Sequence, residues 1–365
     1  MFDRRLIQNF DWGLLCITLI LCATGLLILY SAVSTDDPLN ISYFYKQMAW
    51  YGIGLFLMIL MFLFNYKHLD KWAPVIFFFS LLLLVGVLLV GRHAGGATRW
   101  LVIGPFTIQP SELVKIPVII MLARYFAKNV RQNGIGFRDL LIPMGLTSVP
   151  FFLVLIQPDL GTAGTIVLIA ASMAMFAKID RRTLICFILI AIVAIPVGWK
   201  LLHPYQRERV LTLLSPEKDP LGAGYHIRQS KIAVGSGLIV GKGYLQGTQK
   251  KLSFLPEQHT DFIFSVLAEE WGFAGSMSIL FMFVVLLVFG LNIAHGCRDS
   301  FGAILSVGIT AMIFWQVFIN MGMVTGIMPV VGMPLPLISY GGSSVITLLI
   351  AIGILMNVSM RRFLN

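Results

Sequence analysis

The stretch Phe254-Leu-Pro-Glu-Gln-His-Thr-Asp-Phe-Ile-Phe264 marks the boundary between a long polar segment, about residues 201–261, and an apolar run that follows it. The polar segment has a composition that suits water, in a chain that is otherwise hydrophobic almost throughout. Asp261 stands where the composition changes, so we expect it at the mouth of a membrane helix, near the lipid headgroups. An ionisable residue at that depth is costly and usually has a function. The stretch is therefore the predicted seat of chemistry.

The composition indicates an all-α, polytopic membrane protein. Of the 365 residues, 58% are hydrophobic and only 12% are charged, and the mean hydropathy is +0.86, which excludes an ordinary soluble domain. A spanning helix needs about 20 mostly apolar residues. About ten runs qualify, namely 12–32, 47–65, 72–91, 112–128, 140–157, 161–177, 183–200, 262–294, 300–321 and 343–360. We interpret residues 1–365 as one membrane domain, with the large loop between the seventh and eighth spans.

Lysine and arginine in the short loops predict the orientation. One side holds Arg4, Arg5, Lys67, Lys71, Arg124, Lys128, Arg131, Arg138, Lys178, Arg181, Arg182, Arg298, Arg361 and Arg362, and the other only Lys46, Arg92, Arg99 and Lys115. Both termini are therefore expected in the cytoplasm and the 201–261 loop outside. Topology and attraction to anionic lipid account for most of the net charge of +10, so nucleic-acid binding is not needed. The basic surplus in the outer loop suggests an anionic ligand such as a lipid phosphate.

Two further polar groups are expected at the outer membrane surface. Glu112 and Lys115 are three residues apart on one helix, so they share a face and can form an ion pair. The pair is either a structural tie between helices or a polar element of a substrate cavity. Asp159 is either the N-cap of the helix that follows, with Thr162 at N3, or a second carboxylate at the level of Asp261.

An irregular outer segment is predicted at about 322–344. Its stretch Met328–Ser344 is apolar but contains three prolines and three glycines, so a regular helix is excluded. Irregular backbone at membrane depth is tolerated only where it is buried in protein or lines a cavity. Gly341-Gly-Ser-Ser opens the last span, and the free N–H groups of a helix N-terminus suit an anion, with Ser343 among them. The alternative is a purely structural re-entrant turn.

A glycine run at Gly235–Gly243 invites comparison with a phosphate-binding loop. Position 236, where the first glycine of that motif belongs, is serine, and Lys242 is followed by glycine, so the pattern fails. Nucleotide binding is therefore not expected. Topology instead brings together the outer groups described above, which are Glu112, Lys115, Asp159, Asp261 and Ser343. The sequence predicts one outward-facing site.

Four motifs together resemble the SEDS family (shape, elongation, division, sporulation), and the likeness covers the whole chain. They are Gln157-Pro-Asp-Leu-Gly-Thr, the stretch that ends at Phe264, Ala268-Glu-Glu-Trp-Gly and Pro334-Leu-Pro-Leu-Ile-Ser-Tyr-Gly-Gly-Ser-Ser. Gln157 and Gly332-Met-Pro-Leu-Pro are more similar to the RodA branch than to FtsW.

The resemblance implies a peptidoglycan glycosyltransferase of the bacterial cytoplasmic membrane, with a GT-C-like helical fold. Such an enzyme polymerises lipid II for cell elongation and rod shape, together with a class B penicillin-binding protein and the elongation machinery. By the same resemblance, Asp261 matches an essential outer-loop aspartate, and Glu112 with Lys115 matches a helix pair.

The chemistry of this reaction agrees with the residues. A β-1,4 bond formed from an α-linked sugar diphosphate needs a base for the attacking hydroxyl and a cationic environment for the diphosphate. Asp261 is the candidate base, with His259 and Thr260 beside it as candidate substrate contacts. Candidates for the diphosphate are Arg207, Arg209, Lys231 and Lys242. A divalent cation, Mg or Mn, could share that role, and no other cofactor is expected.

Two rival functions remain at this point. A flippase or transporter for lipid-linked sugars would equally carry intramembrane charges and a re-entrant loop. It would be expected to show inverted repeats with broken helices in both halves, whereas the large loop occurs in one. A non-catalytic scaffold for a penicillin-binding protein is the third interpretation, and it leaves the outer carboxylates unexplained.

Overall fold

The computed structural model describes residues 10–34, 41–94, 97–103, 106–129, 135–183, 223–248 and 259–362, with short pieces at 185–186, 189, 192, 207 and 211–213. Most of the seventh predicted span lies outside the described residues, as do Arg209 and the outer-loop stretches 201–206, 208–210, 214–222 and 249–258. All statements below concern the described part of the chain.

Eleven helices and three strands make up the described elements. The helices are α2 (Trp12–Val33), α3 (Ile41–Leu63), α4 (Lys67–Val90), α5 (Pro110–Leu113), α6 (Lys115–Asn129), α7 (Phe137–Ile156), α8 (Leu160–Phe176), α11 (Ala223–Ser236), α13 (Ile263–Gly296), α14 (Ser300–Val324) and α15 (Gly342–Arg361). The strands are β1 (Arg92–Ala94), β2 (Ala97–Ile103) and β3 (Phe106–Ile108).

Seven of these helices are long and apolar enough to cross a membrane, which are α2, α3, α4, α7, α13, α14 and α15. The helical, multi-pass class predicted from composition is therefore confirmed. The count of ten is not: α8 is a shorter apolar helix, and the fourth predicted span is divided into α5 and α6. The second span was placed too late, at residue 47, because Tyr43, Tyr45 and Lys46 lower the hydropathy of the first turns of α3 without preventing helix formation.

A small antiparallel sheet occupies the predicted second outer loop, in the order β1-β2-β3. Leu101 is paired with Ile108, and Ile103 with Phe106. The all-α expectation missed this sheet because its strands are three to seven residues long. Cross-strand pairing satisfies backbone N–H and C=O groups that would otherwise be costly near a membrane.

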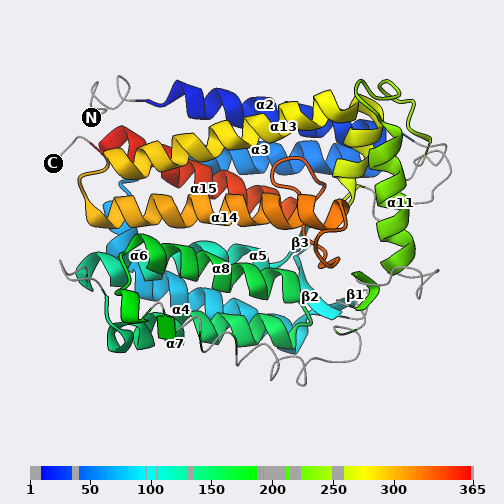
Figure 1. Ribbon diagram of the computed structural model, residues 1–365. Coiled ribbons are helices and arrows are strands. Elements are labelled where there is room, and N and C mark those ends of the chain that lie inside the picture. Colours follow the sequence, from blue (N-terminus) through cyan, green and yellow to red (C-terminus); the bar gives the residue numbers. More distant parts are fainter. Residues whose placement is uncertain are drawn as a thin grey trace.

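The long helices run roughly parallel to one another in a bundle, and α11 lies across one end of it (Figure 1). Helix α14 lies between a group made of α2, α3, α13 and α15 and a group made of α4, α6, α7 and α8. The two most buried spans are α15 and α14. The chain termini lie at one end of the bundle, and the strands, α11 and the first turns of α13 and α15 lie at the other. We call this second end the site end.

Helix α13 is broken at Gly272, whose φ is 66° and ψ is −161°. Residues on both sides of the break bond to the glycine run described above. After the break, the N–H of Phe273 donates to the Leu238 carbonyl at 2.8 Å, and before it the Glu269 carbonyl accepts from the N–H of Lys242 at 3.0 Å. Gly241 also has a positive φ, 83°, and packs against the backbone of the break. The glycine run therefore satisfies the broken helix and has a structural role.

Candidate functional site

Glu112 and Lys115 form an ion pair inside the bundle, where α5 gives way to α6. The distance from Lys115 Nζ to Glu112 Oε1 is 2.8 Å, and the two residues are 3% and 0% exposed. Glu112 Oε2 accepts no hydrogen bond within the described part of the chain. A buried ion pair is expensive to build, because both charges lose their hydration. Its position and its unused oxygen make it a candidate element of a polar site.

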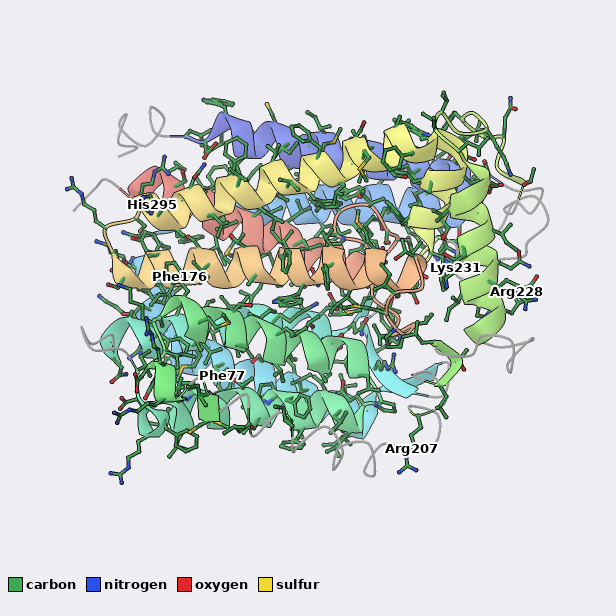
Figure 2. The ribbon with its side chains drawn as sticks, viewed as in Figure 1. Phe77, Phe176, Arg207, Arg228, Lys231 and His295 are labelled. Carbon is green, nitrogen blue, oxygen red and sulfur yellow. The ribbon has the colours of Figure 1, made fainter. Side chains whose placement is uncertain are left out.

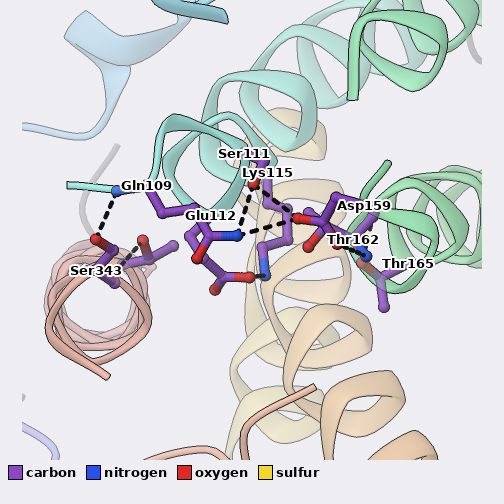
Figure 3. A network of polar contacts seen from close by, with 9 residues as sticks. Gln109, Ser111, Glu112, Lys115, Asp159, Thr162, Thr165 and Ser343 are labelled. Carbon is purple, nitrogen blue, oxygen red and sulfur yellow. Dashed lines mark hydrogen bonds and ion pairs between the residues drawn. The ribbon is translucent and has the colours of Figure 1, made fainter. Parts of the chain in front are cut away.

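Asp159 joins α8 to α5. Its Oδ2 accepts from the Ser111 hydroxyl and from the Gln109 amide, both at 3.0 Å, and its Oδ1 accepts from the Thr162 N–H at 3.3 Å (Figure 3). The last contact is the N-cap that the sequence predicts. The other two contacts show that the same carboxylate is also the centre of a buried hydrogen-bond network.

Ser343 connects α15 to this network. Its hydroxyl accepts from the backbone N–H of Gln109 at 2.8 Å, as Figure 3 shows, and it lies in the first turn of α15. The N–H of Gly341, just before that helix, donates to the side-chain oxygen of Gln47 at 3.2 Å. The first turn of α15 is thus held between α3 and α5.

Asp261 lies two residues before the start of α13 and is held through its backbone. Its carbonyl accepts from the Asn320 amide at 3.0 Å. The carbonyl of Thr260 accepts from the Ser339 hydroxyl at 2.6 Å. Residues 325–341, between α14 and α15, form no helix, so the irregular segment is shorter than the predicted 322–344 because α14 continues to Val324. This segment supports the aspartate.

His259 is held by aromatic rings of α3 and of the irregular segment. Its ring stacks on Tyr43 with centroids 4.6 Å apart, and its carbonyl accepts from the Tyr340 N–H at 2.9 Å. The pKa of Tyr340 is raised, mainly by burial and to a lesser extent by the neighbouring Tyr43. Its hydroxyl is therefore protonated at neutral pH. Tyr43 of α3 therefore lies beside the candidate site.

The basic candidates have different surroundings. Lys242 Nζ lies 2.7 Å from Glu269 Oε1, so part of its charge is engaged by a buried carboxylate. Lys231, on α11, is exposed and its ammonium lies against Gly326 at the end of α14. Figure 2 shows Lys231 on the side of α11 that faces α14, with Arg207 well apart from it. Arg209 lies outside the described residues.

Sequence reasoning gave no role to four buried polar residues. Glu269 and Glu270 are 1% and 2% exposed, and the Glu270 carboxylate accepts from the Ser31 hydroxyl at 2.6 Å. Gln316 and Asn320 are buried on α14. The available signal was the rarity of polar groups in apolar runs. Among the described residues, no group of three or more His, Cys, Asp or Glu side chains could hold a metal ion, and we assign no residue to a divalent cation.

The fold and the site together define a multi-pass membrane protein, and in the described part of the chain its buried charged side chains, on Glu112, Lys115, Asp159, Glu269 and Glu270, lie toward one end of an apolar helix bundle. Residues 12–363 match the cell cycle protein family of FtsW, RodA and SpoVE. The chain belongs to this family, which confirms the resemblance.

Relatives and solved structures agree with that assignment. The peptidoglycan glycosyltransferase MrdB of Escherichia coli (strain K12) is 41% identical over 355 residues, which cover 97% of this chain and 94% of the relative. The stage V sporulation protein E of Bacillus subtilis (strain 168) is 39% identical, over 96% of each chain.

A structure described as a peptidoglycan synthase complex that coordinates polymerization and crosslinking matches with a TM-score of 0.82 and 34% identity, over 98% of this chain and 99% of that one. Thermus thermophilus RodA matches with a TM-score of 0.72 and 30% identity, over 98% of each chain.

Proposed function

We propose that the protein is a peptidoglycan glycosyltransferase that polymerises lipid II into β-1,4-linked glycan strands for cell elongation and rod shape. The observation that carries the proposal is that Asp261 is fixed by backbone hydrogen bonds at the site end. The irregular segment that supports it leads at once into Ser343, which is bonded to the network of Asp159. Relatives named peptidoglycan glycosyltransferase support the same activity.

In the proposed reaction Asp261 is the general base. It takes the proton of the acceptor 4-hydroxyl while that oxygen attacks the anomeric carbon of the donor, and the bond from this carbon to the diphosphate oxygen breaks. One displacement inverts the α-linked donor to a β-linked product and needs no enzyme nucleophile. The departing diphosphate takes the electron pair and needs cationic or N–H partners nearby.

Lys231 is the preferred partner for the diphosphate. Its ammonium lies at the end of α14, on the same side as the segment that supports Asp261, and its side chain is exposed. Lys242 is a weaker candidate because Glu269 already pairs with it. In this proposal His259 and Thr260 contact the substrate by their position, and Glu112 with Lys115 is a polar element of the site.

The partner and the location follow from the same proposal. The matched synthase complex is described as coordinating polymerization with crosslinking, which supports a class B penicillin-binding protein as partner here. The site end faces the outside of the bacterial cytoplasmic membrane, and both termini face the cytoplasm, because basic residues are concentrated in the loops at the end of the termini.

The orientation predicts opposite labelling of two exposed positions. A cysteine that replaces Gln246 should react with a membrane-impermeant maleimide on intact cells, and one that replaces Arg298 should react only after permeabilisation. The native cysteines should be removed first, because Cys16 is exposed and could react. Cys297 cannot itself serve as the probe, because burial raises the pKa of its thiol, which would react poorly on either side. The reverse pattern would contradict the assigned sides.

A reconstitution experiment separates the proposed enzyme from a flippase. The wild-type protein, with its penicillin-binding partner, is placed in vesicles that contain fluorescent lipid II, and products are resolved by gel. We expect glycan ladders that lengthen with time. A flippase would instead move labelled lipid II between leaflets without lengthening any chain, and that result would reject the proposed function.

A further inference from the structure

Two buried amides on α14 have unused hydrogen-bonding groups. Gln316 and Asn320 are one helical turn apart and are 1% and 0% exposed. The Asn320 nitrogen donates to the carbonyls of Asp261 and Met333, at 3.0 and 2.6 Å, which fixes its amide so that Oδ1 points away from them. In the described part of the chain, Asn320 Oδ1 and both polar atoms of the Gln316 amide have no partner. An unsatisfied buried group costs about 1–3 kcal/mol, so such groups call for a ligand.

Both amides point into the bundle. Phe314 and Phe318 are 41% and 46% exposed on the opposite side of α14, and Thr310 faces α13 at Gly290. With 3.6 residues per turn, Gln316 and Asn320 lie between the face that touches α6 and the face that touches α13. They therefore face the interior near α6 and α15, both of which contact α14.

Helix register places Gln316 at the depth of Glu112. Gly308 of α14 packs against Ile119 of α6, and the two helices run in opposite directions (Figure 1). Gln316 is eight residues after Gly308, or about 12 Å along the axis, and Glu112 is seven residues before Ile119, or about 10 Å. Glu112 Oε2 is also a buried oxygen without a partner in the described part of the chain.

We propose that Glu112, Gln316 and Asn320 form a polar binding site for hydroxyl groups, adjacent to Asp261. The carboxylate oxygen and the Asn320 carbonyl accept hydrogen bonds, and the Gln316 amide both donates and accepts. A hydroxyl group also does both, so it matches this set. The hydroxyl belongs either to the sugar of the lipid-linked substrate, which rests on the function proposed above, or to ordered water.

The test replaces Gln316 by methionine, which keeps the length of the side chain and removes both polar atoms. The matched control is Gln47→Met, because Gln47 is equally buried and its amide is satisfied by the Ser339 carbonyl and the Gly341 N–H. The control should lower Tm, since it leaves two backbone groups unpaired. Each purified variant is measured for Tm with and without lipid II and for KM and kcat in polymerisation.

If the sugar binds at this site, Gln316→Met should raise KM for lipid II about two- to ten-fold, with a smaller change in kcat, and should weaken the Tm increase that lipid II causes. If water binds there, Tm of the variant should fall without lipid II while KM is unchanged. A variant with a higher Tm than wild type and unchanged kinetics would overturn the inference. Failure of the proposed function is a separate result, because the wild-type protein would then make no glycan from lipid II, whatever the Tm values of the variants.

Discussion

Replacing Lys115 by methionine should destabilise the protein and reduce polymerisation sharply. The ammonium is fully buried and pairs with Glu112 at 2.8 Å, so the variant leaves a buried carboxylate without its cation. Breaking a buried pair from one side costs about 3–5 kcal/mol. Unfolding followed by tryptophan fluorescence in detergent should show a loss of this size, and glycan ladders should shorten or disappear.

A double variant, Glu112→Gln with Lys115→Met, separates the two interpretations of this pair. Removing both charges is often close to neutral for stability, so the double variant should regain most of the lost stability. We expect its polymerisation to stay low, because the proposed site needs the carboxylate and the ammonium. Recovery of both stability and polymerisation would show that the pair is only a structural tie.

The long spans could be predicted because about 20 consecutive apolar residues are a strong signal. The last two predicted spans, 300–321 and 343–360, compare with Ser300–Val324 and Gly342–Arg361 in the structure. Hydropathy averaged over a span does not reveal a short break in the helix. The split between α5, which ends at Leu113, and α6, which begins at Lys115, therefore appears as one span in the sequence.

The break in α13 could not be read from sequence in the same way. The predicted eighth span, 262–294, has nearly the observed bounds, but Gly272 within it adopts a positive φ because the glycine run 235–243 supplies hydrogen bonds to the opened backbone. That pairing joins segments about 30 residues apart, and a local pattern contains no information about it. The same glycines fail the pattern of a phosphate-binding loop, and in the structure they bond to the opened helix instead.

The site was predicted as a set of residues on one side of the membrane, with two local contacts, the Glu112–Lys115 pair and the Asp159 N-cap. Its contacts between distant segments came only from the structure. Topology alone placed Glu112, Asp159 and Asp261 at one level. It could not show that the Asp159 carboxylate accepts a hydrogen bond from the Ser111 hydroxyl, or that the Asn320 amide donates one to the Asp261 carbonyl. These contacts join helices far apart in the chain, so no spacing rule predicts them.

Replacing Asp261 by asparagine should abolish nearly all polymerisation and leave the fold intact. The hydrogen bond from Asn320 is made to the Asp261 backbone carbonyl, which the substitution retains, so Tm should change little. The side chain keeps its shape and loses its proton acceptor, and general-base catalysis typically contributes about 10²–10⁴-fold in rate. The loss should therefore appear in kcat, with binding of lipid II preserved.

The most direct measurement compares initial rates of glycan formation by the wild-type protein and by Asp261→Asn, each reconstituted with lipid II and the penicillin-binding partner. Binding is measured in parallel by the Tm increase that lipid II produces. We expect equal Tm increases and a rate lower by about 10²-fold or more in the variant. Near-normal ladders from Asp261→Asn would contradict the central claim and leave Asp159, or Glu257 in the outer loop, as the next candidate base.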